Sequence, residues 1–325
     1  MGDTISTRNW NPFITQCFAM EFGFKKEPII ENMLKRIFIY LREMYPLSSW
    51  FGTFSLGFMV LTVAWRLGGS PYHSFQWHTL LGCVALCFFS LILRVKDEFK
   101  DFEDDKINYP NRPVPSGRVL KKDLLVLGWF CVFVTLAVSV WSEEVLYMAM
   151  GSLIYSFLML KWFFQEERMK ASLPLALITH HPIVVLHFMY LLTVNQTTNY
   201  PIYEWQILTI LPLVLMMTNW ELCRKIRMPK EENTYTTYSK IWGPRPASFA
   251  ALILQLIVLT TGSYLIHAMG CSLIWNVVYA LGFVGLMFPV FNYWRTIRTK
   301  KPLKFWAENQ ILWTVLSLIT AGWWG

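Results

Sequence analysis

Long apolar stretches alternate with short polar segments along most of the chain. A stretch of about 20 apolar residues is long enough for a helix to cross the hydrocarbon core of a bilayer, so each one predicts a membrane-spanning helix. We predict nine spans, at residues 46–67, 76–96, 122–141, 145–164, 172–194, 204–223, 247–268, 273–294 and 305–324. Because no long hydrophilic insertion separates them, we expect an all-α, polytopic membrane protein whose nine transmembrane helices form one domain over residues 46–325.

Residues 1–45 precede the first predicted span and form a separate region that we expect to be cytosolic or interfacial. Their first part is polar and broken by proline, so it lacks the apolar core of a signal peptide. Further along, Ile30, Leu34, Ile37 and Leu41 recur at helical spacing, with basic residues on the other faces. This pattern predicts an amphipathic helix that lies on the bilayer or packs under the bundle.

The composition and the charge distribution agree with a membrane protein. Apolar residues make up 54 % of the chain and charged residues only 15 %, against about 25 % charged residues in soluble domains. The net charge of +8 would suit a nucleic-acid partner, but with nine spans all of the 29 lysines and arginines except Arg66 fall on one side of the membrane. The positive-inside rule then places the amino terminus in the cytosol and the carboxyl terminus on the opposite side. We therefore predict an integral, multi-pass membrane protein with no nucleic-acid partner.

The cysteines and a possible glycosylation site add little to this interpretation. The six cysteines form no CxxC pair, so neither a disulfide framework nor a zinc site is predicted. Asn195 begins an Asn-Gln-Thr glycosylation pattern in a loop predicted to lie on the far side of the membrane. Use of this site would place the protein in the endomembrane system, and we expect the endoplasmic reticulum.

A strongly acidic segment follows the second predicted span. Six of the 21 acidic residues lie within nine positions: Asp97, Glu98, Asp101, Glu103, Asp104 and Asp105. On a helix, carboxylates three or four residues apart share one face and repel each other. Either the interleaved Lys96, Lys100 and Lys106 offset this repulsion, or a divalent cation does, since carboxylate and phosphate oxygens are the ligands that magnesium prefers. A plain solvated helix is the remaining interpretation.

A second polar segment ends the sixth predicted span. Glu221 lies at the mouth of the apolar stretch, and Arg224, Lys225 and Arg227 follow it. Glu221 can form an ion pair with Lys225, four residues on. Alternatively, it helps to hold a second metal while the basic residues bind phosphate oxygens. Both polar segments lie on the cytosolic face in the nine-span topology, and together they suit a diphosphate whose long apolar tail runs between the helices.

Three histidines lie within the fifth predicted span: His180, His181 and His187. Ionisable groups at that depth usually face a cavity. His180 and His181 directly precede Pro182, however, and can instead satisfy carbonyl groups that the proline frees. Both interpretations stay open from the sequence.

These motifs resemble the UbiA superfamily of intramembrane prenyltransferases over residues 46–325. The first signature of that family is NDxxDxxxD followed by a turn with proline and arginine. Its places are occupied here by Asp97, Glu98, Asp101 and Asp105, with Asp97 in place of the asparagine and Glu98 in place of the first aspartate, and residues 111–117 resemble the turn. The family's layout of nine helices around a central cavity is similar to the predicted topology. The resemblance implies that Mg²⁺ binds the carboxylates of Asp97, Glu98, Asp101, Asp105 and Glu221, and that Asp101, Asp105 and Glu221 are catalytic.

The chain also departs from the family pattern. The second signature, DxxxD, reads Glu221-x-x-x-Lys225, and a TYS sequence with Tyr238 follows it. This form is similar to the membrane-bound terpene cyclase branch, of the kind found in fumagillin biosynthesis. The resemblance implies that the isoprenyl diphosphate is bound by Arg112, Arg224, Lys225, Arg227, Tyr238 and Lys240.

We therefore predict a magnesium-dependent terpene cyclase that ionises an isoprenyl diphosphate, expected to be farnesyl diphosphate, and cyclises the carbocation to a sesquiterpene. The alternative is a prenyltransferase that moves the prenyl group to an aromatic or quinoid acceptor in meroterpenoid or quinone biosynthesis. A transporter with intramembrane charges at Glu221, His180 and His181 is a third interpretation, against which the gathering of charge at one face argues. The expected partners are the diphosphate substrate and the lipid bilayer, and the sequence predicts no particular protein partner.

Overall fold

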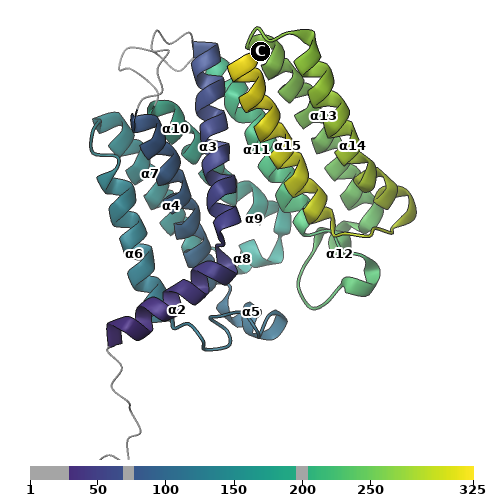
Figure 1. Cartoon of the computed structure of the whole chain (residues 1–325). Coiled ribbons are helices and arrows are strands. Elements are labelled where there is room, and N and C mark those ends of the chain that lie inside the picture. Colours follow the sequence, from purple (N-terminus) through teal and green to yellow (C-terminus); the bar gives the residue numbers. More distant parts are fainter. Residues whose placement is uncertain (1–28, 69–76, 195–203) are drawn as a thin grey trace, which may run out of the picture.

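The computed structural model describes residues 29–68, 77–194 and 204–325, and the regular elements within these ranges are all helices (Figure 1). The bundle is built from α3 (Leu47–Gly68), α4 (Trp77–Lys100), α6 (Lys121–Ala137), α7 (Glu143–Leu160), α9 (Leu173–His180), α10 (Pro182–Val194), α11 (Glu204–Arg224), α13 (Pro244–Ala268), α14 (Leu273–Thr296) and α15 (Leu303–Trp324). The shorter elements are α2 (Ile29–Met44), α5 (Phe102–Asn108), η1 (Trp162–Phe164), α8 (Glu166–Ala171), η2 (Pro229–Glu231) and α12 (Tyr238–Trp242).

A helix overlies each predicted span, with α9 and α10 together forming the fifth one. By length and apolarity, six segments of the described chain qualify as membrane spans: Leu47–Leu67, Trp77–Lys100, Glu143–Leu160, Leu173–Val194, Pro244–Ala268 and Leu273–Thr296. The helices outside this set are α6, which has only 17 residues, and α11 and α15, which carry the buried polar residues Asn219 and Gln310. The all-helical membrane bundle is confirmed, and the number of nine spans stays a prediction.

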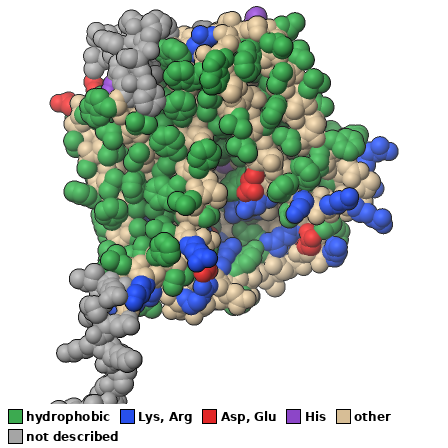
Figure 2. Space-filling view, in the orientation of Figure 1, with side chains coloured by type: hydrophobic (Ala, Val, Ile, Leu, Met, Phe, Trp, Pro, Cys, Tyr) green, Lys and Arg blue, Asp and Glu red, His purple; other side chains and the backbone are tan. Residues whose placement is uncertain are grey.

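The outer surface of the bundle is apolar. Trp129 and Phe133 of α6 expose about 71 % and 70 % of their surface. On α14, only 17 % of the apolar stretch that could span a membrane is buried inside the protein. Hydrophobic side chains cover most of the visible face, while lysine and arginine gather towards one end (Figure 2). A monomeric soluble protein rarely exposes an apolar patch of more than a few hundred Å², so we assign this surface to lipid contact.

The polar connections gather at one end of the bundle. Figure 1 shows α2, α5, α8, α12 and the loop between α14 and α15 at that end, and the carboxyl terminus at the other. Arg66, which was predicted to lie alone on the far side, donates from Nη2 to the carbonyl oxygen of the last residue, Gly325, at 3.2 Å. The grouping of the loops therefore agrees with the charge pattern. Asn195 lies outside the described residues.

The predicted amphipathic helix is α2, which packs under the bundle. Arg36 donates to both carboxylate oxygens of Asp123 at the start of α6, at 2.6 and 2.9 Å, and Glu43 pairs with Arg118 at 2.5 Å. Leu34 stays 57 % exposed on another face. Polar contacts fix the helix to the bundle and leave apolar side chains free for the membrane interface.

Small residues allow two pairs of helices to approach closely. The α-carbon of Gly282 on α14 faces the indole of Trp313 on α15, and Gly262 on α13 faces the ring of Tyr279 on α14. A Cβ atom at either glycine would overlap with the facing ring. Close packing of this kind is a main source of helix association in membranes, where lipid is as apolar as the side chains.

Candidate functional site

The acidic segment forms the end of α4, a bend, and α5. Helical hydrogen bonds continue through the bend, since the amide of Asp101 donates to the carbonyl of Asp97, and the amide of Asp105 to that of Asp101, each at 2.8 Å. Asp101 itself has φ −102° and ψ 14°, which ends α4 and starts α5. The predicted ladder of carboxylates is therefore present, with a change of direction in its middle.

Arginines neutralise the two buried carboxylates of this ladder. Glu98 is 2 % exposed and accepts from Nη2 of Arg94 at 2.5 Å. Asp105 is 7 % exposed, and both of its oxygens accept from Nη1 of Arg112 at 2.7 and 2.8 Å. A buried carboxylate is costly unless it is paired, and these two ion pairs meet that need without a metal.

Asp97 and Asp101 are left with weaker partners. The side chain of Asp97 is about half-exposed and lies 3.5 Å from Nζ of Lys100. Burial raises the pKa of Asp101 to about 6, opposed by Lys100 and reinforced by the neighbouring charge of Asp97. Lys96, which the sequence offered as a counter-charge, instead bonds Oγ of Ser156 at 2.5 Å. These two carboxylates are therefore the ones best placed to gain from an added cation.

In the second polar segment, Glu221 forms the ion pair that the sequence allowed. Its Oε1 lies 3.0 Å from Nζ of Lys225, and its Oε2 lies 2.7 Å from Nη2 of Arg224. Two residues earlier, the buried Asn219 donates to Oε1 of Gln310 on α15 at 3.1 Å. The amide pair joins α11 to α15, and the ion pairs hold two predicted phosphate-binding side chains beside each other.

Tyr109 connects the acidic segment to the basic one. Its hydroxyl accepts from Nη2 of Arg227 at 3.0 Å, and the guanidinium of Arg112 lies 3.9 Å from the centre of its ring. A second link joins the same two loops, from Oγ1 of Thr234 to Oδ1 of Asn108 at 2.9 Å. The two segments are 118 residues apart at the Tyr109–Arg227 contact. The sequence analysis singled out Arg227 but not Tyr109, Asn108 or Thr234.

Tyr238 and Lys240, both predicted to bind substrate, have structural contacts, Tyr238 with α9 and Lys240 with the loop that precedes α12. Tyr238 is 1 % exposed, and its hydroxyl donates to the carbonyl of Leu173 at 3.4 Å. The ammonium group of Lys240 donates to the carbonyls of Asn233 and Tyr235. Their role in binding stays a prediction.

Tyr235, which the sequence analysis missed, lies closer to the charged groups. Its pKa is raised mainly by burial, and its hydroxyl is within the electrostatic reach of Arg224 and Asp101. The guanidinium of Arg227 also lies 5.5 Å from the centre of its ring. Its place in the TYTTYS sequence, next to the basic cluster, was the signal that could have drawn attention to it.

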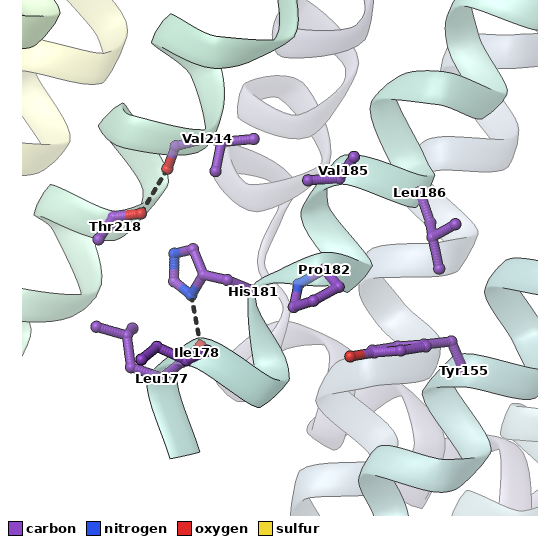
Figure 3. Close-up of a pocket in the computed structure, with 9 residues that line it drawn as sticks. All are labelled: Tyr155, Leu177, Ile178, His181, Pro182, Val185, Leu186, Val214 and Thr218. Carbon is purple, nitrogen blue, oxygen red and sulfur yellow. Dashed lines mark hydrogen bonds between the residues drawn. The ribbon is translucent and has the colours of Figure 1, made fainter. Parts of the chain in front are cut away.

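An apolar cavity of about 550 Å³ opens between α7, α9, α10 and α11 (Figure 3). Its volume is within the range of about 300–1,000 Å³ that is usual for small-molecule sites. Leu177, Ile178, Val185 and Leu186 are among the side chains that line it. One edge of the cavity lies close to the second polar segment. Thr218, which lines the cavity, precedes Glu221 on α11 by less than one helical turn.

The family model for the UbiA prenyltransferase family matches residues 54–316, most of the chain. The chain belongs to this family. Family members use prenyl diphosphates. No curated protein matches the chain by sequence.

Solved structures of UbiA homologues share the fold of this family member. The apo structure of a homologue from Aeropyrum pernix K1 has a TM-score of 0.63 and 13 % identity, covering 83 % of this chain and 97 % of that one. A digeranylgeranylglyceryl phosphate synthase gives a TM-score of 0.61 and 13 % identity, with 89 % and 99 % covered. A homologue from Archaeoglobus fulgidus, described as bound to GPP and Mg²⁺, gives 0.58 and 14 %, with 88 % and 98 % covered.

The carboxylates of this UbiA family member fit a magnesium ion that shares its ligands with a substrate. Within the described residues, no three His, Cys, Asp or Glu side chains form a ready-made metal site. Magnesium, however, is usually bound through one or two carboxylates together with substrate phosphates. Asp97 and Asp101 can supply such a pair, while Glu98, Asp105 and Glu221 already have basic partners. The predicted roles of those three as metal ligands stay predictions.

Proposed function

We propose that this UbiA family member is a magnesium-dependent terpene cyclase, which ionises an isoprenyl diphosphate and cyclises the resulting carbocation. The observation that carries the proposal is the contact between Tyr109 and Arg227, which joins the acidic and the basic segments at 3.0 Å. A diphosphate between these segments would meet carboxylates that suit a metal and guanidinium groups that suit phosphate. Its prenyl tail would extend into the apolar cavity, and farnesyl diphosphate is the substrate that we propose.

Different residues would bind the metal and the phosphate oxygens of the diphosphate. Asp97 and Asp101 would hold Mg²⁺, which neutralises the charge that develops on the leaving group. Arg112 uses only Nη1 for its ion pair with Asp105, and a guanidinium has five N–H donors, so the others are free to bind phosphate oxygens. Arg224 and Lys225 are held in place by Glu221, and Arg227 by Tyr109. Donors that are already oriented stabilise developing charge without reorganisation.

The lining of the cavity suits a hydrocarbon chain such as a prenyl tail. The hydroxyl of Tyr155 donates to the carbonyl of Thr179, and that of Thr218 to the carbonyl of Val214, both at 2.7 Å. Both hydroxyl hydrogens are therefore occupied within the protein, and apart from His181 the rest of the lining is apolar.

Prenyl transfer to an aromatic or quinoid acceptor is the second candidate, favoured by the family to which the chain belongs. Incubation of microsomes with farnesyl diphosphate and Mg²⁺, without an acceptor, separates the two candidates. We expect a cyclic hydrocarbon by gas chromatography and mass spectrometry, and its loss when EDTA removes the metal. Product formation that depends on an added acceptor would contradict the cyclase.

A pair of neighbouring variants tests the metal assignment. Asp101→Asn removes a carboxylate that we assign to Mg²⁺, and we expect diphosphate release to fall by roughly 100-fold or more, the scale of losing one charge-stabilising group. Asp104→Asn is the matched control, since Asp104 is exposed on α5, and its activity should stay within about twofold of wild type. Equal activity of the two variants would overturn the assignment.

The location of the protein is part of the same proposal. We infer an endoplasmic reticulum membrane protein with nine spans and a cytosolic amino terminus. The shared end of the polar loops and the position of Arg66 beside the carboxyl terminus support it.

A further inference from the structure

Three consecutive aromatic residues, Trp162, Phe163 and Phe164, form a turn between α7 and α8, which we call the aromatic turn. Their φ values are 50°, 50° and 58°, in the left-handed region. A Cβ atom makes this region unfavourable, and bulky side chains adopt it rarely. A run of such residues persists where surrounding contacts hold it, and strained backbone of this kind gathers at functional sites. The contacts of the rings therefore indicate what the turn does.

The aromatic turn packs against the end of α4. The centre of the Trp162 ring lies 4.5 Å from Nζ of Lys100, in a cation–π contact. The same indole lies 5.6 Å from the ring of His180 on α9, and the ring of Phe163 lies 5.9 Å from it. Two of the three aromatic side chains thus hold the turn against Lys100 and His180.

His180 gives the ammonium group of Lys100 a second partner. Its Nδ1 is 2.8 Å from the carbonyl oxygen of Ala176. A carbonyl oxygen can only accept a hydrogen bond, so Nδ1 carries the hydrogen. In the neutral ring the lone pair is then on Nε2, which lies 3.5 Å from Nζ of Lys100. An indole face and an imidazole lone pair therefore both attract the ammonium group.

The third neighbour of this ammonium group is Asp97, one of the two carboxylates that we assign to Mg²⁺. Nζ of Lys100 lies 3.5 Å from Oδ1 of Asp97, whereas a direct bond between an ammonium and a carboxylate is about 2.7–2.9 Å long. The side chain of Lys100 is only 11 % exposed, so solvent ions screen its charge little. Lys100 thus offsets the repulsion within the acidic ladder without a direct bond to the oxygens that a metal needs.

We propose that Trp162 is a positioning residue that holds Lys100 back from Asp97 and Asp101, so that a divalent cation can reach both carboxylates. The inference rests on the magnesium site of the proposed function. A lysine has a flexible stem and three donors. Without the indole contact, the ammonium group would bond the carboxylates directly, and a metal would have to displace it.

This arrangement also combines the two ways of offsetting the acidic ladder that the sequence allowed. Lys100 supplies the counter-charge before a metal binds, and the metal supplies it afterwards. The affinity for the metal then depends on how firmly the ammonium group is held at the aromatic turn.

Metal binding without substrate tests this role, because it does not depend on turnover. Purified full-length protein in detergent is titrated with Mn²⁺, and free Mn²⁺ is measured by electron paramagnetic resonance. For Trp162→Leu we expect the affinity for Mn²⁺ to fall by about three- to tenfold, the scale of losing one cation–π contact. Lys100→Met removes the competing charge and should raise the affinity above wild type by about the same factor. The double variant should match Lys100→Met, because the indole then has no ammonium group to hold.

Two control variants separate positioning from a general effect on the turn or on the charge. Phe164→Leu changes the same turn at a ring that is 72 % exposed. Lys106→Met removes another lysine of the acidic segment, whose side chain is 47 % exposed. Both should bind Mn²⁺ within about twofold of wild type, as is usual for surface substitutions.

The outcomes distinguish this inference from the magnesium site on which it rests. A fall in affinity for Trp162→Leu that Lys100→Met does not reverse would give Trp162 a purely structural role and overturn the inference. An unchanged affinity in Trp162→Leu would overturn it as well. Lys100→Met leaves the turn intact and decides the matter if Trp162→Leu does not fold, since failure to raise the affinity contradicts the inference. Equal binding of Mn²⁺ by the wild type and Asp101→Asn would instead refute the magnesium site itself.

Discussion

At the scale of single residues, the identity of the neighbours decides what each carboxylate does. Glu98 and Asp105 are buried and matched by Arg94 and Arg112, so their charges are neutralised within the chain. Asp101 has a pKa raised to about 6 because it is partly buried, next to like charges. Six acidic residues that look alike in the sequence thus divide into some that hold arginines in place and some that remain suited to a cation.

Tyr109→Phe tests whether the contact between the two polar segments matters for binding. The change removes the hydrogen bond to Arg227 and keeps the ring that the guanidinium of Arg112 faces at 3.9 Å. Hydrogen bonds to charged groups contribute about 1.5–3 kcal/mol, so we expect the KM for the diphosphate to rise roughly tenfold or more. Steady-state assays of diphosphate release measure it. Tyr147→Phe, at a side chain that is 64 % exposed on α7, is the control, and an equal KM in both variants would contradict the role of Tyr109.

At the scale of elements, the break between α9 and α10 places His181 at the cavity. Pro182 has no amide hydrogen and starts α10, and the rings of His180 and His181 both bond carbonyls in the last turn of α9. The rings bond the carbonyls of Ala176 and Leu177, whereas the carbonyl that Pro182 leaves without an amide donor is that of Ile178, so the observed contacts are not the predicted ones to a freed carbonyl. His181 does line a cavity, in agreement with the other interpretation.

A second element-scale prediction concerns the packing of α14 against α15. Gly282→Ala would place a methyl group against the indole of Trp313, which is fixed by a hydrogen bond from Nε1 to the carbonyl of Tyr279 at 3.0 Å. We expect a loss of about 1–3 kcal/mol in the free energy of unfolding, as is usual for overpacked cores. Thermal unfolding in detergent, followed by size-exclusion chromatography with fluorescence detection, measures the shift in midpoint.

Gly285→Ala is the matched control for this change. It lies one turn further on the same helix, and a Cβ atom there meets nothing within 4 Å. Its midpoint should match the wild type or exceed it, because alanine is the better helix former. Equal midpoints for the two variants would contradict a close contact at Gly282.

At the scale of the whole molecule, the charged segments are separated from the apolar cavity. The charged segments lie at one end of the bundle, and the apolar cavity lies between α7, α9, α10 and α11 (Figures 1 and 3). In the proposed cyclase, the diphosphate would bind at the charged end of the bundle and the hydrocarbon chain in the apolar cavity.

The count of spans gives a whole-molecule prediction. Nine spans place the two termini on opposite sides of the membrane, whereas an even number would place them on the same side. With a tag at each end in sealed microsomes, we expect protease to remove the amino-terminal tag and to spare the carboxyl-terminal one. Use of Asn195, seen as a mobility shift that Asn195→Gln abolishes, would support the far-side loop. Loss of both tags would refute the nine-span topology.

The sequence by itself determined the class, the helical segments and the two polar segments to which we assign the chemistry. Apolar length sets where a helix can span a bilayer, and lysine and arginine follow the membrane sides, so both are visible without any contact between distant residues. Pairing four residues apart on one helix is equally local, and Glu221 and Lys225 form the ion pair that this spacing allows.

Only the tertiary structure decided which side chains meet across the bundle. Tyr109 and Arg227 are 118 residues apart, and nothing in their local sequence indicates that they touch. The same is true of Asn219 with Gln310. Helix packing sets these contacts, since it depends on the shapes of facing surfaces and not on the period of one helix. The ion pairs that set Asp97 and Asp101 apart within the acidic ladder are local ones, since Arg94 pairs with Glu98 four residues on and Arg112 with Asp105 seven residues back. Only the burial of those two carboxylates depends on how the helices pack.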